Sequence, residues 1–223
     1  MSGWDVSGWD WVTISALATA VGTLVLAVAT FASVRSGNRA ARNAERALLA
    51  GLRPLLFPSK FSDDVLKVSF MDRHTLTVHG GRGEVEVTED VVYLAMSLRN
   101  VGHGMAVLHG WFVTGGSVSS AEVPDHVPLA SFRRLTRDLY VPPNDVFFWQ
   151  GALRDRAEPV FAEVVESVGK GEALRIELLY SDEEGGQRTI TRFSLLPHET
   201  PDGSSVWLSS VGRHWNIDRA DPR

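Results

Sequence analysis

The chain has 223 residues, no cysteine and a formal net charge of −5. The absence of cysteine excludes disulfides, thiolate catalysis and cysteine-based zinc sites. Five arginines against three acidic residues give residues 1–53 a formal charge of +2, so that residues 54–223 carry −7. General nucleic-acid binding needs a basic surface, and we therefore expect no nucleic-acid partner for this acidic domain.

An uncharged apolar run occupies residues 11–34, near the start of the chain. As a helix rising about 1.5 Å per residue it would be roughly 36 Å long, enough to cross a hydrocarbon core about 30 Å thick. It lacks the polar face of a buried helix in a soluble protein. A cleaved signal peptide is a second alternative, because Ala27-Val28-Ala29 has the pattern of a cleavage site. The flank before the run is acidic rather than basic, and we therefore predict a retained single-pass membrane helix.

The residues beside this run predict its orientation in the membrane. Residues 1–10 contain two aspartates and no basic residue, whereas four arginines follow the run. Arginines next to a span tend to stay in the cytoplasm, and tryptophans favour the membrane–water interface. We therefore expect a cell-membrane protein with its N-terminus outside and its C-terminal domain in the cytoplasm. The predicted interface residues are Trp4, Trp9, Trp11, Arg35, Arg39, Arg42 and Arg46.

The basic stretch 35–53 is predicted to continue the membrane helix. Its first four arginines recur at intervals of 4, 3 and 4 residues, so they share one helical face, which suits anionic lipid headgroups. The helix is expected to end near Gly51 and Pro54, since the residue before a proline avoids the helical conformation. Within the apolar run, Ala18 and Gly22 fit the small-xxx-small pattern, which makes homo-oligomerisation through this helix a hypothesis.

From Pro54 onward, apolar residues alternate with polar ones, as is typical of strands. The runs 76–78 and 85–87 lie on either side of the glycine-rich segment 80–83 and predict a β-hairpin. The clearest hairpin joins residues 174–180 to 188–196 around the turn at 181–186. Further strands are expected over residues 66–70, 92–98, 105–114, 126–135, 146–150 and 206–211.

One short helix is predicted inside the domain, opening at Glu158-Pro159 and ending at Gly169. Short antiparallel strands with regular turns favour a mainly-β fold, an Ig-like antiparallel β-sandwich, with a partly open barrel as the alternative. The expected organisation is an outer flank at 1–10, a transmembrane helix at 11–34, a basic juxtamembrane helix at 35–53, a β-sandwich domain at 54–215 and a polar tail at 216–223.

The chain contains no recognisable pattern of catalytic or metal-binding residues. Its seven histidines are scattered and form no HExxH motif, and no G-x-S-x-G elbow occurs. Arg133, Arg134 and Arg137 could bind phosphate or an acidic partner, although a solvated strand face is the simpler interpretation. Trp111 and Phe148 are expected in the core. We predict no catalytic residue, no cofactor and no metal site.

Three pieces of the sequence carry a family resemblance: Arg53-Pro54-Leu55-Leu56, the strand end Leu98-Arg99-Asn100-Val101-Gly102-His103-Gly104, and the hairpin Tyr180-Ser181-Asp182…Gly186. With them the chain loosely resembles bacterial single-pass membrane proteins of unknown function that have an N-terminal span, an arginine-rich helical stretch and a small β-sandwich. His103 stands where such proteins often have proline. We interpret the pieces as fold signatures, because Asn and Gly turn the chain and Asp caps a turn. The resemblance implies no activity.

Two functions remain open at this point. The membrane anchor favours a non-enzymatic protein whose β-sandwich binds a protein partner or organises a membrane complex, because a sandwich presents edges and loops for contact. The alternative is a membrane-tethered ligand sensor or enzyme whose site is assembled from distant residues, which would require a polar pocket.

Overall fold

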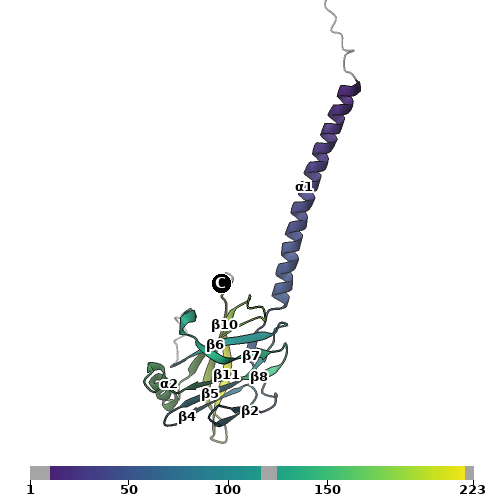
Figure 1. Ribbon diagram of the computed structural model, residues 1–223. Helices are drawn as coiled ribbons and strands as arrows, with labels where there is room; N and C mark the ends of the chain where they lie inside the picture. Colours follow the sequence, from purple (N-terminus) through teal and green to yellow (C-terminus); the bar gives the residue numbers. More distant parts are fainter. Residues whose placement is uncertain (1–10, 117–124, 219–223) are drawn as a thin grey trace, which may run out of the picture. The chain divides into compact units, whose positions relative to one another are not determined.

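The computed structural model describes residues 11–116 and 125–218. The chain divides into two compact units, Met1–Ala50 and Gly51–Arg223. Helix α1 (Trp11–Gly51) is continuous over 41 residues and has no buried residue (Figure 1). It is long and apolar enough to span a membrane. The basic stretch therefore continues the apolar helix, as predicted, and the helix ends three residues before Pro54.

The second unit, which we call the β domain, consists mostly of strands. They are β1 (Leu56–Pro58), β2 (Leu66–Ser69), β3 (Thr75–Val78), β4 (Arg82–Val87), β5 (Val92–Asn100), β6 (Ala106–Gly115), β7 (Arg133–Val141), β8 (Val146–Leu153), β9 (Leu174–Ser181), β10 (Thr189–Glu199) and β11 (Ser205–Asn216). The expected internal helix is present as α2 (Pro159–Gly169). The prediction of a mainly-β antiparallel fold after a long helix is confirmed.

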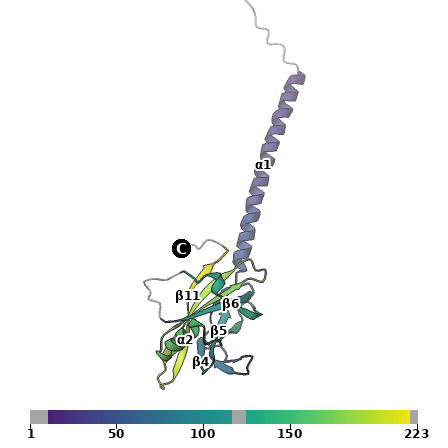
Figure 2. The ribbon, with the colours of Figure 1, turned by 60° about the vertical axis from the view of Figure 1, so that its left-hand side comes forward.

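Nine strands form one antiparallel sheet, in the order β1-β5-β4-β11-β10-β9-β6-β7, with β8 also paired to β5. Strands β2 and β3 form a small sheet of their own. The large sheet curls, as the crossing strands in Figures 1 and 2 show. The curl brings the ring centroids of Trp111 on β6 and Trp149 on β8 to 5.4 Å, although these strands are not paired. Hydrogen bonds thus join the strands into one curled sheet.

The main core lies on the inner face of this sheet, where residues two apart along each strand point the same way. Strand β5 contributes Leu94, Met96 and Leu98, all fully buried, and helix α2 adds Phe161 and Val164. A smaller cluster packs the β2–β3 hairpin against β5, and consists of Val68, Phe70, Leu76, Val78, Tyr93 and Ala95. Burial of these side chains on both faces of β5 makes it the central strand of the domain.

The predicted hairpin around residues 80–83 is wrong. Strand β3 pairs with β2 instead, and β4 pairs with β5 and β11. The glycines of this segment permit close backbone approach: a Cβ on Gly80 would lie 2.1 Å from the Lys60 oxygen. The Gly81 N–H donates to Ser59 Oγ at 2.9 Å. The segment therefore carries the chain from the small sheet to the large one.

The strand predicted over 126–135 is displaced along the chain. A single 3₁₀ turn at Leu129–Ser131 follows Pro128, and β7 begins only at Arg133 and continues to Val141. Proline fixes its own φ near −65° and donates no hydrogen bond, which favours a turn at this point over a strand.

Candidate functional site

The pieces that carry the family resemblance meet at the end of the β domain where β1 begins. Asn100 is fully buried. Its Oδ1 accepts hydrogen bonds from the backbone N–H groups of Leu55 at 3.1 Å and Gly102 at 3.0 Å. Its Nδ2 donates to the carbonyl oxygens of Gly104 at 2.8 Å and Val141 at 3.1 Å. One side-chain amide therefore holds together the start of β1, the turn after β5 and the end of β7.

The third piece of the resemblance, the hairpin that begins at Tyr180, reaches the start of β1 through a chain of buried side-chain hydroxyl groups. The Tyr180 hydroxyl accepts from the Leu56 N–H at 3.3 Å and lies 2.8 Å from Thr191 Oγ1. Thr191 Oγ1 in turn lies 2.6 Å from His214 Nδ1. Burial raises the pKa of the fully buried Tyr180. Together with Asn100 and Arg53, these residues form what we call the β1-start network.

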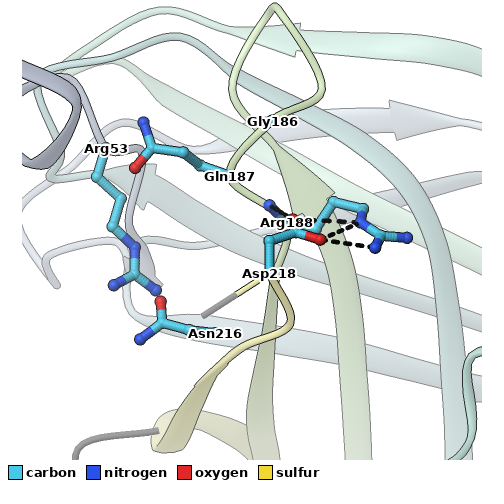
Figure 3. Close-up of a pocket in the computed structure, with 6 residues that line it drawn as sticks. All are labelled: Arg53, Gly186, Gln187, Arg188, Asn216 and Asp218. Atoms are coloured by element: carbon cyan, nitrogen blue, oxygen red, sulfur yellow. Dashed lines mark hydrogen bonds and ion pairs between the residues drawn. The ribbon is translucent and has the colours of Figure 1, made fainter. Parts of the chain in front are cut away.

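A small polar hollow adjoins this network (Figure 3). It is lined by Arg53, Gly186, Gln187, Arg188, Asn216 and Asp218. The Arg188 side chain contacts Asp218 Oδ1 through Nε at 3.0 Å and Nη2 at 2.6 Å. This contact lowers the pKa of Asp218. The Arg53 guanidinium points toward Asn216 in Figure 3 and donates to Thr189 Oγ1 at 3.1 Å. The charges of the hollow are thus used to fasten strand ends, including the first residues of the predicted polar tail.

A second polar group, the Asp72 cluster, fastens the β2–β3 hairpin. Asp72 Oδ2 accepts from the Tyr93 hydroxyl and from Arg154 Nη1, both at 2.6 Å. The hydrogen bond from Tyr93 has the largest effect and the one from Arg154 the second largest, and together they hold the pKa of Asp72 well below its usual range. The His74 ring stacks on Tyr93 at 4.0 Å and lies 3.1 Å from Glu86. These contacts connect the hairpin with β4, β5 and the segment after β8.

A buried ion pair lies on the outer face of the large sheet. Glu177 is fully buried, and its Oε1 accepts from Arg192 Nε at 2.8 Å and Nη2 at 2.6 Å. Its Oε2 accepts from the Val127 N–H at 3.0 Å, and Arg192 also donates to the Asp125 oxygen at 3.2 Å. The Arg192 guanidinium lies 4.6 Å from the Trp215 ring centroid. The ion pair therefore fixes residues 125–127 against strands β9 and β10, and we assign it a structural role.

One serine and one histidine, the residue types that a serine hydrolase uses as nucleophile and general base, are in contact. Ser181 Oγ lies 2.7 Å from His109 Nε2 and 2.6 Å from the Asp182 carbonyl oxygen. A carbonyl oxygen only accepts, so the hydroxyl donates to Asp182 and His109 Nε2 carries a hydrogen. A general base must accept the proton of its nucleophile, and this geometry therefore does not present an activated serine.

The predicted membrane residues all belong to α1 or to the flank before it. Trp4 and Trp9 lie outside the described residues, and Trp11 is the first residue of α1, with 85% of its surface exposed. The other predicted site residues on α1 are all exposed: Ala18, Gly22, Arg35, Arg39, Arg42 and Arg46. A Cβ added to Gly22 would meet no atom within 4 Å. Within the described part of α1, an added Cβ at Gly22 would therefore meet no obstacle.

The three candidate arginines of β7 differ in their contacts. Arg133 pairs with Glu158 and lies 5.5 Å from the Trp111 ring centroid, whereas Arg134 and Arg137 are exposed. Among the residues that the structure describes, no three His, Asp or Glu side chains gather closely enough to hold a metal ion.

Sequence reasoning quoted Asn100 as a turn residue but missed the Asp72 cluster and the Glu177–Arg192 pair. No local signal marks them, because their members are far apart in the sequence. A comparison with models of known protein families gives no match for this chain, and a comparison with curated protein sequences gives none.

Proposed function

We propose that this protein is a membrane-anchored, non-enzymatic interaction protein, held in the cell membrane by α1, whose β domain binds a protein partner or organises a membrane complex. The observation that carries the proposal is the short, fastened connection between the two units. Only Leu52 separates Gly51, the end of α1, from Arg53. Arg53, Leu55 and Leu56 are each hydrogen-bonded into the β domain. A long flexible linker would let the domain search a wide volume, whereas here a single residue lies between the end of α1 and the first residue that is hydrogen-bonded into the β domain.

The orientation is part of the proposal, with the N-terminus outside and the β domain in the cytoplasm. It is supported by the arginines that follow the apolar run. A fluorescent protein fused after Arg223 should fluoresce in the cytoplasm, and an alkaline phosphatase fused at the same place should be inactive. An active phosphatase would place the β domain outside and contradict the proposed orientation.

The interaction itself can be tested by crosslinking the tagged full-length protein in cells and identifying what it captures. The matched control keeps residues 1–53 and carries an unrelated soluble domain in place of the β domain. A partner captured only by the native protein supports the proposal. Capture by both proteins would assign recognition to α1, and capture by neither would favour the alternative, a membrane-tethered ligand sensor or enzyme.

A further inference from the structure

We propose that the polar hollow beside the β1-start network binds the carboxylate group of a small organic acid, held by the Arg53 guanidinium. This inference goes beyond the proposed function, which concerns a protein partner, and does not rest on it. The hollow has a volume of about 240 Å³ and is partly open to solvent (Figure 3). Pockets for drug-sized ligands measure about 300–1,000 Å³, so this one suits a single small polar group.

Arg53 brings to the hollow a positive charge that no carboxylate of the described chain neutralises. Its guanidinium has five N–H donors, and its one hydrogen bond within the described residues runs from Nη2 to Thr189 Oγ1 at 3.1 Å. The side chain is half-buried, and charges withdrawn from water are usually paired. A carboxylate matches the planar guanidinium, because its two oxygens accept two parallel hydrogen bonds.

The charges around the hollow favour a ligand with one negative charge. Two arginines and one aspartate line it, so that its formal charge is +1. Asp218 is occupied by Arg188, whose Nε and Nη2 lie 3.0 and 2.6 Å from Oδ1. Asp182 does not line the hollow, and its carboxylate accepts three hydrogen bonds from residues 186 and 187. A carboxylate would neutralise the hollow, whereas a phosphate monoester, with a charge of about −1.5 to −2, would exceed its positive charge.

Asn216 offers a second hydrogen-bond donor in the same hollow. Figure 3 shows the Arg53 guanidinium pointing toward the Asn216 side chain. This side chain is half-buried and has no hydrogen bond to another described residue. Its Nδ2 can donate to a carboxylate oxygen while Arg53 donates to the other. A bound acid would therefore connect Arg53, just before β1, with Asn216 at the end of β11, and should slow hydrogen exchange at Leu55 and Leu56.

The test compares acetate with acetamide, its uncharged isostere, on the full-length protein in zwitterionic lipid nanodiscs at constant ionic strength. Saturation-transfer NMR should show that acetate binds at least about tenfold more tightly than acetamide, and that Arg53→Gln removes this difference. Arg134→Gln is the matched control, because Arg134 is exposed on β7 and does not line the hollow. It should change the Kd of acetate less than about twofold. Equal binding of acetate and acetamide to the native protein would overturn the inference.

Asp218→Asn separates binding from folding, because it should strengthen binding. The variant removes a negative charge from the hollow and leaves Arg188 without its carboxylate, so that the Kd of acetate should fall at least about threefold. Tryptophan fluorescence confirms that the variant folds. An unchanged or higher Kd in the folded variant would overturn the inference. A lower Kd after deletion of residues 219–223 would also overturn it, since the chain's own tail would then compete for the hollow.

The crosslinking experiment described above distinguishes a small acid from a carboxylate that belongs to a protein partner. Arg53→Gln should capture the same partner as the native protein, because the small acid and the partner would occupy different sites. Loss of the partner together with loss of acetate binding would assign the hollow to a carboxylate of the partner and would overturn the small-acid assignment.

Discussion

Replacement of Asn100 by alanine should lower the free energy of unfolding of the β domain by about 3–5 kcal/mol. The substitution removes four hydrogen bonds at once. A typical bond contributes about 1 kcal/mol net, and a buried group left without a partner costs about 1–3 kcal/mol. The bonds to Gly102 and Val141 are buried, whereas water can reach the part-buried groups of Leu55 and Gly104. The loss is large against a typical domain stability of about 5–15 kcal/mol.

Urea unfolding of the full-length protein in detergent micelles, followed by tryptophan fluorescence, measures this loss. Asn216→Ala is the matched control, because Asn216 is half-buried and no hydrogen bond of its side chain occurs in the described structure. It should change the stability by less than about 1 kcal/mol, as surface substitutions usually do. If Asn100→Ala and Asn216→Ala agree within that margin, the Asn100 amide does not hold the start of β1.

Four further perturbations follow from the same contacts. Glu177→Gln should cost about 3–5 kcal/mol because it leaves Arg192 buried without its carboxylate, and the double variant Glu177→Leu/Arg192→Met should cost less in urea unfolding. The lowered pKa of Asp72 means that its contribution to stability is present above its ordinary value of 3.8 and is lost as the pH falls below it. The protection of the β2 and β3 amides against hydrogen exchange, measured relative to their intrinsic exchange rates, should therefore fall in acid, and Asp72→Asn should remove that pH dependence. Gly104→Ala should destabilise the domain, since a Cβ there would lie 1.7 Å from a backbone oxygen, which thermal unfolding can measure. Gly22→Ile should reduce energy transfer between labelled copies in vesicles if α1 pairs through its small residues.

Local patterns predicted most elements of this fold, but not β1, the bounds of β7 or the pairing of β3. The continuous α1, the helix α2 and the β9–β10 hairpin each depend on neighbouring residues, and all three are present. The pairing of β3 with β2 depends on close approach at Gly80, which periodicity does not encode.

The polar sites are harder to predict for the same reason. Asp72 meets Tyr93 across 21 residues and Arg154 across 82. Nothing near these three residues in the sequence marks them as partners before the strands are placed. The pairing of β5 with β1, β4 and β8 likewise becomes visible only once the order of the strands is known, because a strand's sequence does not state how many neighbours it has.

Strand β5 connects β8 with β1, the first strand after the membrane anchor. It pairs with β8 through eight residues and with β1 through three, Leu56 to Pro58. A force applied at β8 acts on β5 across the longer ladder, and β5 holds β1, the strand that follows the membrane anchor in the chain, across the shorter one. The Asn100 amide reinforces this shorter connection at the end of β5. Asn100→Ala should therefore lower the force at which β1 detaches from β5 in a single-molecule pulling experiment with attachment at α1 and at residue 150, while Asn216→Ala should not. Equal rupture forces for the two variants would show that the Asn100 amide does not hold β1 against load.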